Sequence, residues 1–405
     1  MKVVITDRFP YRGEPFLKIE DKYLQGDVVF FALQAGDNPK DEDITRDSYS
    51  LRVGKMTPKM YLLGIMGVFS GLFADELRIM KKRKVLSLAN IRKAVGMYGR
   101  AKMAESMIRG VLRQKYSDSS SSDTVVLYSY WMAVHALTGV MLKKKLKARF
   151  VTRCHSYDLY EFRSDTGYIP FRRAILDSAD LICPISDNGR DYILNNYGEA
   201  LDKKLLVQRL GTEDHGINPQ EQGEEYVIVS CANIVKEKRL ELIVSALFEM
   251  DRNVKWIHFG EGDKGEEIRS LASQLLDDKH NIQYSFRGRV PNEEIMNFYQ
   301  NNHVDLFVNT SEIEGIPVSI METMSFGIPA IATDVGGTNE IIEHDVNGRL
   351  IEKNVDAETI KEEIINFMNL EGPVVEAFRH NARKKWEELY SAEKNYSKFE
   401  KLLNQ

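Results

Sequence analysis

Hydrophobic and polar positions in the second half of the chain alternate in a regular way. Short apolar runs of strand length are separated by longer amphipathic segments, an arrangement typical of the βα units of a parallel sheet. The expected strands are 226–231, 254–260, 282–288, 304–309, 329–333 and 349–351. The expected helices are 238–250, 265–276, 292–300, 318–326, 338–342 and 356–368. This pattern predicts a doubly wound Rossmann-like domain that binds ligands at the carboxyl ends of its strands.

The first half has a less regular pattern, which still predicts a second α/β unit. The expected strands are 2–6, 27–33, 124–129, 149–153, 180–184 and 205–208, with a long helical stretch over 58–112 and a Ser/Asp-rich surface loop at 117–123. The polar segment 211–225 contains Gly and Pro and precedes an apolar strand, so we place the boundary there. The expected domains are 1–212 and 223–381, followed by 382–405, where an amphipathic helix needs a surface to cover.

Composition narrows the class of protein. A chain of 405 residues is long enough for two domains, and 43% hydrophobic with 28% charged residues is typical of globular proteins and excludes a disordered or fibrous chain. The formal net charge of −5 gives no field for wrapping a polyanion, so nucleic acid is not expected as a partner. Three separated cysteines cannot build a disulfide framework, which favours a reducing, cytoplasmic setting.

One apolar segment raises the question of a membrane. Residues 60–74 form an uncharged run that is shorter than the roughly 20 residues a spanning helix needs, and basic clusters follow at 80–84 and 143–147. Two interpretations stay open. The segment is either a buried helix followed by a solvated basic turn, or an interfacial face that docks on anionic lipid. The N-terminus shows no pattern of a signal peptide.

The most informative motif is residues 311–340 (SEIEGIPVSIMETMSFGIPAIATDVGGTNE). The spacing predicts Glu314 on a loop and Glu322 on a helix that begins near Val318. A helix N-terminus offers free N–H groups and about half a positive charge, which suits a diphosphate, whereas two carboxylates suit hydroxyl groups. The helix N-terminus and the two glutamates together fit a sugar nucleotide, which has both a diphosphate and hydroxyl groups. Two solvent-facing glutamates at a helix start are the alternative, which the second glycine turn at 335–337 makes less favoured.

Four stretches in order, 153–160, 230–247, 286–290 and 311–340, resemble glycosyltransferase family 4. The resemblance implies a retaining enzyme with the GT-B fold, in which two Rossmann-like doubly wound domains face a central cleft and the C-terminal helix crosses back to the first domain. The chain is most similar to bacterial exopolysaccharide, capsule and O-antigen enzymes. The implied reaction moves a hexose from a nucleotide-sugar donor, with UDP favoured, to a glycan acceptor that is lipid-linked. No cofactor is implied, and the expected location is the cytoplasm, at the inner face of the plasma membrane.

The resemblance also implies roles for residues of the donor side. Glu322 binds the ribose hydroxyls, Glu314 binds a hydroxyl of the transferred sugar and Lys238 binds the phosphates. The backbone near sugar and phosphate is that of Gly315, Ile316, Pro317 and Val318, and the nucleobase lies at Arg289 and Val290. Asn233 departs from the family, which often has an arginine there, so Arg239 is a candidate to supply the missing charge.

On the acceptor side the resemblance implies that His155 contacts the transferred sugar. Residues placed near it or near the acceptor are Arg153, Asp158, Gly13 and Glu14. No carboxylate is an obvious nucleophile for a double displacement, so a front-face substitution is preferred.

No metal site is expected, because a DxD-like pair occurs only at Asp41–Asp43 in a polar loop. Two alternatives remain beside the transferase. One is a GT-B epimerase or phosphorylase that acts without a glycan acceptor. The other is a non-catalytic sugar-nucleotide-binding partner, which the uncharged Asn233 favours.

Overall fold

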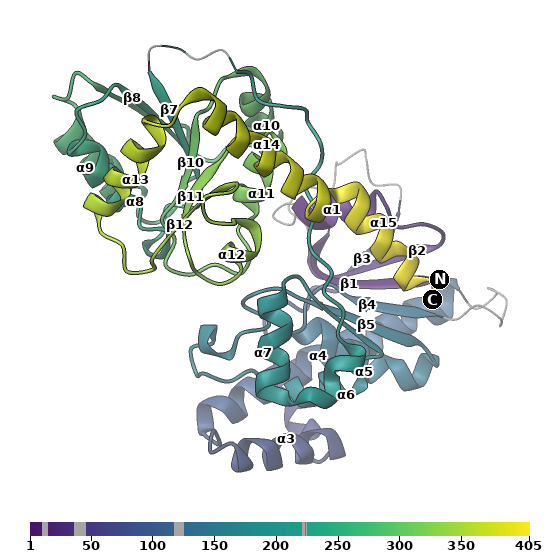
Figure 1. Cartoon of the computed structure of the whole chain (residues 1–405). Coiled ribbons are helices and arrows are strands. Elements are labelled where there is room, and N and C mark those ends of the chain that lie inside the picture. Colours follow the sequence, from purple (N-terminus) through teal and green to yellow (C-terminus); the bar gives the residue numbers. More distant parts are fainter. Residues whose placement is uncertain (10–14, 36–45, 117–124, 221–222, 224) are drawn as a thin grey trace. The chain divides into compact units, whose positions relative to one another are not determined.

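The structure is a computed structural model that describes residues 1–9, 15–35, 46–116, 125–220, 223 and 225–405. Its contacts divide the chain into two compact units, the first made of Met1–Arg209 with Tyr396–Gln405 and the second of Leu210–Asn395. Each unit holds one six-stranded sheet whose strands are all parallel (Figure 1). The expectation of two Rossmann-like α/β domains is therefore confirmed.

The sheet of the first unit has the strand order β3-β2-β1-β4-β5-β6. These strands are β1 (Lys2–Phe9), β2 (Val28–Ala35), β3 (Asp47–Ser50), β4 (Val126–Ser129), β5 (Arg149–Cys154) and β6 (Leu181–Pro184). The helices are α1 (Pro15–Asp21), α2 (Pro58–Gly67), α3 (Gly71–Lys82), α4 (Leu88–Lys115), α5 (Val134–Leu146), α6 (Arg172–Ser178) and α7 (Asp187–Tyr197). Because β1 pairs with both β2 and β4, it lies in the middle of the sheet and its apolar side chains are buried.

Three features of the first unit differ from the prediction. The expected strand at 205–208 is wrong, because Leu205 makes only one isolated bridge, to Ile182. The helical stretch 58–112 is divided into α2, α3 and α4, and the hydroxyls of Thr57, Ser70 and Ser87 cap their N-termini. The short strand β3 was not predicted, because its sequence DSYS lacks aliphatic residues.

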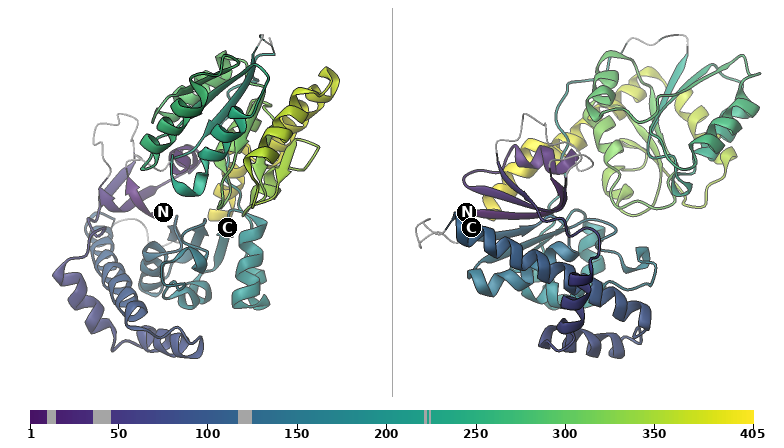
Figure 2. Two further views of the ribbon diagram at one scale, coloured as in Figure 1. Left: turned by 90° about the vertical axis from the view of Figure 1, so that its left-hand side faces the viewer. Right: turned by 180° about the vertical axis from the view of Figure 1, so that it is seen from behind.

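The sheet of the second unit has the strand order β12-β11-β10-β7-β8-β9. Its strands are β7 (Tyr226–Cys231), β8 (Val254–Phe259), β9 (Ile282–Phe286), β10 (Leu306–Asn309), β11 (Ala330–Thr333) and β12 (Gly348–Ile351). Its helices are α8 (Leu240–Phe248), α9 (Gly265–Leu276), α10 (Asn292–Asn301), α11 (Val318–Ser325), α12 (Thr338–Ile341), α13 (Ala357–Met368) and α14 (Gly372–Leu389). Helices cover both faces of the sheet (Figure 2). All six predicted strands are confirmed within two residues at each end.

The C-terminal segment differs from the single helix expected over 382–403. It contains the end of α14 and a separate helix α15 (Ala392–Leu403). The break is stabilised by the linker, because the N–H of Thr212 donates to the carbonyl of Tyr390 at 2.9 Å and the N–H of Ala392 donates to the carbonyl of Thr212 at 3.0 Å. Phe399 on α15 is fully buried in the core of the first unit.

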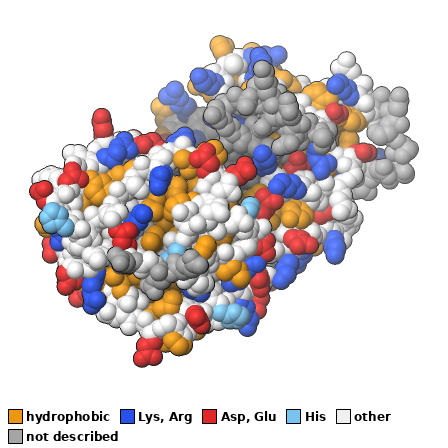
Figure 3. Space-filling model, turned by 90° about the horizontal axis from the view of Figure 1, so that it is seen from above, with side chains coloured by type: hydrophobic (Ala, Val, Ile, Leu, Met, Phe, Trp, Pro, Cys, Tyr) orange, Lys and Arg blue, Asp and Glu red, His pale blue; other side chains and the backbone are white. Residues whose placement is uncertain are grey.

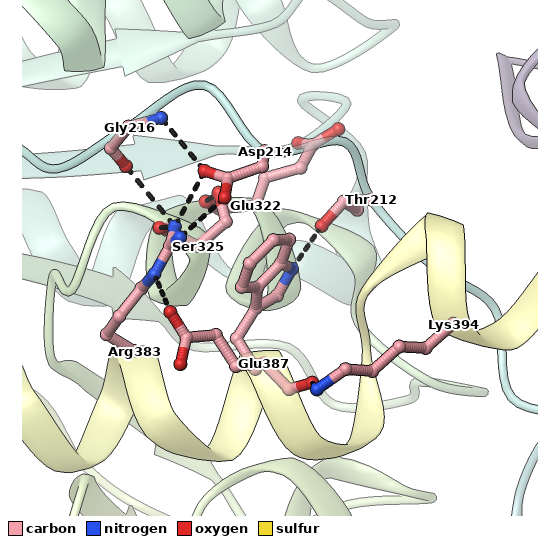
Figure 4. A network of polar contacts seen from close by, with 9 residues as sticks. Thr212, Asp214, Gly216, Glu322, Ser325, Arg383, Glu387 and Lys394 are labelled. Carbon is pink, nitrogen blue, oxygen red and sulfur yellow. Dashed lines mark hydrogen bonds and ion pairs between the residues drawn. The ribbon is translucent and has the colours of Figure 1, made fainter.

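A polar network fixes the linker to α14 within the second unit (Figure 4). The guanidinium of Arg383 donates to both carboxylate oxygens of Asp214, at 2.9 and 2.6 Å. The same guanidinium lies 4.5 Å from the ring centroid of Trp386, whose indole N–H donates to the hydroxyl of Thr212 at 2.7 Å. Together these contacts make residues 212–216 a fixed part of the second unit.

Two surface properties bear on partners. In the part of the chain that the structure describes, no single helix is long and apolar enough to cross a bilayer, although α2 and α3, which meet at a bend of 76°, together have the length and apolar composition of a broken span. Figure 3 shows basic and acidic side chains interspersed on one face, in keeping with the nearly balanced composition.

Candidate donor site and the strand ends of the first unit

Lys238 and Glu314 form an ion pair in the second unit. The ammonium of Lys238 lies 2.5 Å from Oε1 of Glu314, and both side chains are largely buried, with 22% and 11% of their surface exposed. Nδ2 of Asn309, the last residue of β10, donates to the same carboxylate oxygen at 3.3 Å. Two of the three predicted catalytic residues thus contact each other, and Asn309, which the sequence analysis missed, orients one of them.

The loop that carries Lys238 is fastened to the loop after β10. Lys238 lies in a short 3₁₀ turn (Lys236–Lys238) before α8. The sequence had predicted it in the first turn of that helix, and this prediction is wrong. Oγ1 of Thr310 donates to the carbonyls of Lys238 and Arg239 at 2.8 and 3.1 Å. Nε of Arg239 donates back to the carbonyl of Thr310 at 2.7 Å. The position of the ammonium is therefore set by two loops that both leave carboxyl ends of strands.

Glycines bring the turn 335–337 against the backbone of Glu314 and Gly315. A Cβ on Gly336 would lie 2.2 Å from the carbonyl oxygen of Glu314, and the φ of 59° at Gly336 is one that favours glycine. The N–H of Gly337 donates to the carbonyl of Gly315 at 2.8 Å. This turn supports the loop from which Glu314 projects, so it acts on the site through backbone packing.

The N-terminus of α11 opens beside that loop. Pro317 precedes the helix, and no side chain caps its first turn, so N–H groups are available to an anion. Ile316 is buried, whereas Gly315 and Val318 are half-buried. The predicted order of elements, a loop that carries Glu314 followed by a helix that starts at Val318, is what the structure has.

Glu322 lies in the second turn of α11. Its Oε1 accepts a hydrogen bond from Nδ2 of Asn292 at 2.7 Å, and burial raises its pKa to about 7. Asn292 begins α10, so this bond brings Glu322 to the end of the loop that carries Arg289 and Val290. No contact joins Glu322 to Glu314 among the described residues.

The remaining donor-side positions are less enclosed. Asn233 and Arg289 are exposed, and Val290 is half-buried. Gly288, with a φ of 67°, accepts at its carbonyl from the N–H of Gly260 at 2.9 Å, which fixes the loop after β9 against the loop after β8. These backbones are accessible at the carboxyl ends of β7 and β9, where Rossmann-like sheets bind ligands.

In the first unit, His155 follows β5 and is held in an aromatic setting. Its ring lies 4.2 Å from that of Trp131 and 4.8 Å from that of Tyr130, centroid to centroid. Burial lowers its pKa despite the Asp158 carboxylate 3.7 Å from Nδ1, so the ring is neutral at pH 7. Asp158 accepts from the N–H groups of His155 and Met132, at 2.8 and 2.7 Å, and thereby joins two strand-end loops.

Arg153 differs from the expectation that it could reach an acceptor. Its side chain is fully buried and paired with the carboxylate of Glu20 on α1. Its guanidinium lies 4.4 Å from the ring centroid of Phe399 on α15, so it fastens the C-terminal helix to the first unit. Gly13 and Glu14, the other acceptor-side residues, lie outside the described residues, as do Asp41 and Asp43.

A polar cluster at the carboxyl end of β1 was not predicted. Oδ1 of Asp7 lies 3.8 Å from Nε2 of His135, and Nε2 of Gln34 donates to both Asp7 oxygens, at 3.2 and 3.0 Å. Three adjacent elements contribute these side chains, a convergence that single-residue patterns do not reveal. Within the described ranges, no three His, Cys, Asp or Glu side chains are placed to hold a metal ion.

Comparison with known proteins finds relatives of the second unit. Residues 213–385 match the family of glycosyl transferases group 1. An uncharacterized glycosyltransferase of Methanocaldococcus jannaschii is 26% identical over 61% of this chain and 66% of its own length. The putative colanic acid biosynthesis glycosyltransferase WcaL of Escherichia coli is 27% identical over 58% of this chain and 60% of its own length. The chain thus matches less than two thirds of the length of these curated relatives.

Solved structures extend the likeness to the whole fold. The structure of Anabaena HepE in complex with UDP and glucose has a TM-score of 0.68 at 16% identity, with all of both chains covered. Sucrose-phosphate synthase from Thermosynechococcus elongatus has a TM-score of 0.70 at 15% identity, over 99% of this chain and 98% of that chain. Residues 213–385 thus match the family of glycosyl transferases group 1, in a chain that has the two-domain GT-B fold and resembles bacterial exopolysaccharide and O-antigen glycosyltransferases.

Proposed function

We propose that this chain transfers a hexose from a UDP-sugar to a glycan acceptor that is lipid-linked, with retention of configuration, in bacterial surface polysaccharide synthesis. The observation that carries the proposal is the Lys238–Glu314 pair beside the uncapped N-terminus of α11. A cation, a carboxylate and free N–H groups within one loop cluster match the phosphates and hydroxyls of a sugar nucleotide.

Lys238 and Glu314 are expected to change partners when the donor binds. An ammonium about 4 Å from a phosphate is worth roughly 4 kcal/mol at an effective dielectric of 20, which favours departure of the nucleoside diphosphate. When Lys238 turns to the diphosphate, the carboxylate of Glu314 becomes free to accept from a sugar hydroxyl, while Asn309 keeps it oriented. Donor binding thus replaces the Lys238–Glu314 ion pair by two charge-assisted contacts, one from Lys238 to the diphosphate and one from a sugar hydroxyl to Glu314.

Glu322 is assigned to the ribose hydroxyls, and the backbone at Arg289 and Val290 to the base. With its pKa at about 7, the Glu322 side chain is half protonated at neutral pH, and two hydroxyl donors favour its charged form. The donor should therefore bind more tightly as the pH rises through 7. UDP is favoured by resemblance, and the complex of HepE with UDP and glucose supports that choice.

The mechanism we favour is a front-face substitution. Lys238 and the α11 N–H groups stabilise the leaving diphosphate and so lower the barrier. The acceptor hydroxyl attacks the anomeric carbon from the face that the diphosphate leaves, the bond from that carbon to the diphosphate oxygen breaks, and the hydroxyl proton passes to the departing diphosphate. His155, neutral and held by Trp131, is assigned to contact with the transferred sugar. We propose that no metal ion takes part. Loss of transfer in EDTA with rescue by manganese would contradict that assignment.

A transfer assay tests the proposal. Pure protein is incubated with labelled UDP-hexoses and membrane-extracted glycolipid acceptors, and the anomeric configuration of the product is read by NMR. A product with the donor's configuration is expected. An inverted product refutes retention, and sugar isomerisation without acceptor identifies an epimerase instead.

The exposed, uncharged Asn233 favours one second candidate, a non-catalytic binder of sugar nucleotides. Slow hydrolysis of the donor by pure wild-type protein, absent in Lys238→Ala, speaks against a binder. Tight donor binding with neither hydrolysis nor transfer would favour it.

A further inference from the structure

The surface of α2 has an unusual distribution of side chains. Its glycines face the protein: a Cβ on Gly64 would lie 2.2 Å from the carbonyl oxygen of Val95, and one on Gly67 would lie 2.3 Å from the ring of Tyr98, both residues of α4. Four of its large apolar side chains face outward, whereas Met60 is buried in the core. We call this set the α2 face, and it consists of Tyr61, Leu62, Ile65, Met66 and, directly after the helix, Phe69.

The exposure of the α2 face is large. Leu62, Ile65 and Met66 are 57%, 56% and 61% exposed, and Phe69 is 91% exposed. Leu88 at the start of α4 is 84% exposed. Contiguous exposed apolar side chains at helical spacing mark an interaction surface, whereas a soluble helix normally turns such a stripe to the core.

The sequence on either side of α2 is rich in basic residues. Residues 55–88 contain seven basic and two acidic residues, in a chain whose net charge is −5. Of the two acids, Glu76 is buried and Asp75 is paired with Arg78 at 2.7 Å. The exposed residues Lys81 and Lys82 on α3 and Lys84 just after it follow the apolar helix in sequence, and α3 lies at the outer edge of the first unit (Figure 1).

Ion pairs compensate part of the charge in both basic clusters, and in the first cluster the paired residue is Arg83, which lies 2.7 Å from Glu161, whereas the charges of Lys81, Lys82 and Lys84 face solvent. Lys143 is paired with Asp180 at 2.7 Å, and Lys145 is paired with Glu105 at 2.8 Å. Their charges are therefore partly compensated by the protein itself.

We propose that the α2 face and the lysines of α3 form a docking site for a bilayer of anionic phospholipid. Apolar side chains enter the boundary of headgroups and acyl chains, and lysines contact the lipid phosphates, the combination typical of interfacial anchors. A second copy of the chain fits less well, because an isologous contact would bring two clusters of the same sign together. The inference does not depend on the identity of the donor or of the sugar.

Vesicle sedimentation tests the proposal with the full chain and no sugar nucleotide. Binding is expected to vesicles of equal parts phosphatidylcholine and phosphatidylglycerol, to weaken as salt rises, and to be much weaker with phosphatidylcholine alone. Equal recovery with both vesicles, or no recovery with either, overturns the proposal. Because donor binding is measured separately, failure here leaves the proposed transferase standing.

Variants separate the two contributions. Lys81→Gln with Lys82→Gln should weaken partitioning by about 25-fold, since each lysine near an anionic surface contributes about 1 kcal/mol. Phe69→Ser should weaken it by at least about tenfold. The matched controls are Lys398→Gln on α15 and Val374→Ser on α14, both exposed, and neither should change partitioning.

Unchanged thermal unfolding of each variant shows that folding is intact. Two outcomes would overturn the lipid assignment: unchanged partitioning in the variants of α2 and α3, or a dimer in solution that Phe69→Ser dissociates.

Discussion

At the scale of single residues, the candidate donor site depends on one cation. Lys238 and Lys236 lie in the same 3₁₀ turn, but Lys238 is largely buried and paired with Glu314, whereas Lys236 is exposed. This difference makes Lys236 a matched control for the role of charge at the site.

Replacing Lys238 by Ala should lower turnover at least about a hundredfold, roughly 2.7 kcal/mol of transition-state stabilisation, because the leaving diphosphate loses its cation. Lys236→Ala should retain activity within about twofold. Steady-state transfer kinetics check both variants. Equal activities in the two would remove Lys238 from the mechanism.

Glu322 makes stability depend on pH. Because burial raises its pKa to about 7 from an ordinary 4.5, the folded protein binds this proton more tightly than the unfolded chain does. Its contribution is therefore complete below pH 4.5 and declines as the pH rises to about 7, by at most about 3 kcal/mol. Glu322→Gln should lack that decline. Urea unfolding of both proteins across this range measures the difference, and parallel curves would show that the carboxyl has an ordinary pKa.

At the scale of elements, backbone turns hold the site together. Gly336→Ala should lower both transfer and donor affinity by at least about tenfold, because the new Cβ would collide with the carbonyl oxygen of Glu314 and displace the loop. Gly167→Ala is the control, since Gly167 has a similar φ of 63° and no atom within 4 Å of its Cβ position. Calorimetric titration with the donor checks both. Equal affinity in the two variants would mean that the collision relaxes without moving Glu314.

Sequence patterns predicted elements well where burial alone determines them. Strand β7 and helix α9 have the predicted bounds, because a continuous apolar run determines the strand and an amphipathic period of 3.6 residues determines the helix. The break between α14 and α15 was not predicted, since it depends on hydrogen bonds from Thr212, distant in sequence. Likewise, the loop that carries Glu314 was predicted from its motif, whereas the hydrogen bonds of Asn292 and Asn309 to Glu322 and Glu314 form only in the folded chain.

At the scale of the whole molecule, the chain passes from the first unit to the second and back. Leu210 and Asn395 bound the second unit, and Nδ2 of Asn395 donates to the carbonyl of Leu210 at 2.8 Å. The two connecting segments are thus hydrogen-bonded to each other, and α15 completes the core of the first unit.

Helix α15, at the C-terminus, should therefore stabilise the first unit, most of which comes from the N-terminal half of the sequence. Phe399→Ala is expected to lower the free energy of unfolding by about 3 kcal/mol, because it leaves a cavity and removes the ring under Arg153. Val374→Ala, at an exposed position of α14, should change it by less than about 0.5 kcal/mol. Urea denaturation distinguishes them. A loss below about 1 kcal/mol for Phe399→Ala would indicate that α15 contributes little.

The central claim, that the second unit binds a nucleotide sugar through Glu322 and its neighbours, is tested most directly by thermal unfolding with UDP-, GDP- and ADP-sugars, with and without EDTA, on wild type and Glu322→Ala. A ligand at a hundred times its dissociation constant stabilises the fold by about 2.7 kcal/mol. The account predicts that one nucleotide class raises the unfolding temperature of the wild type, that EDTA leaves the shift unchanged, and that Glu322→Ala loses it. No shift with any donor, or an equal shift in the variant, would contradict the account.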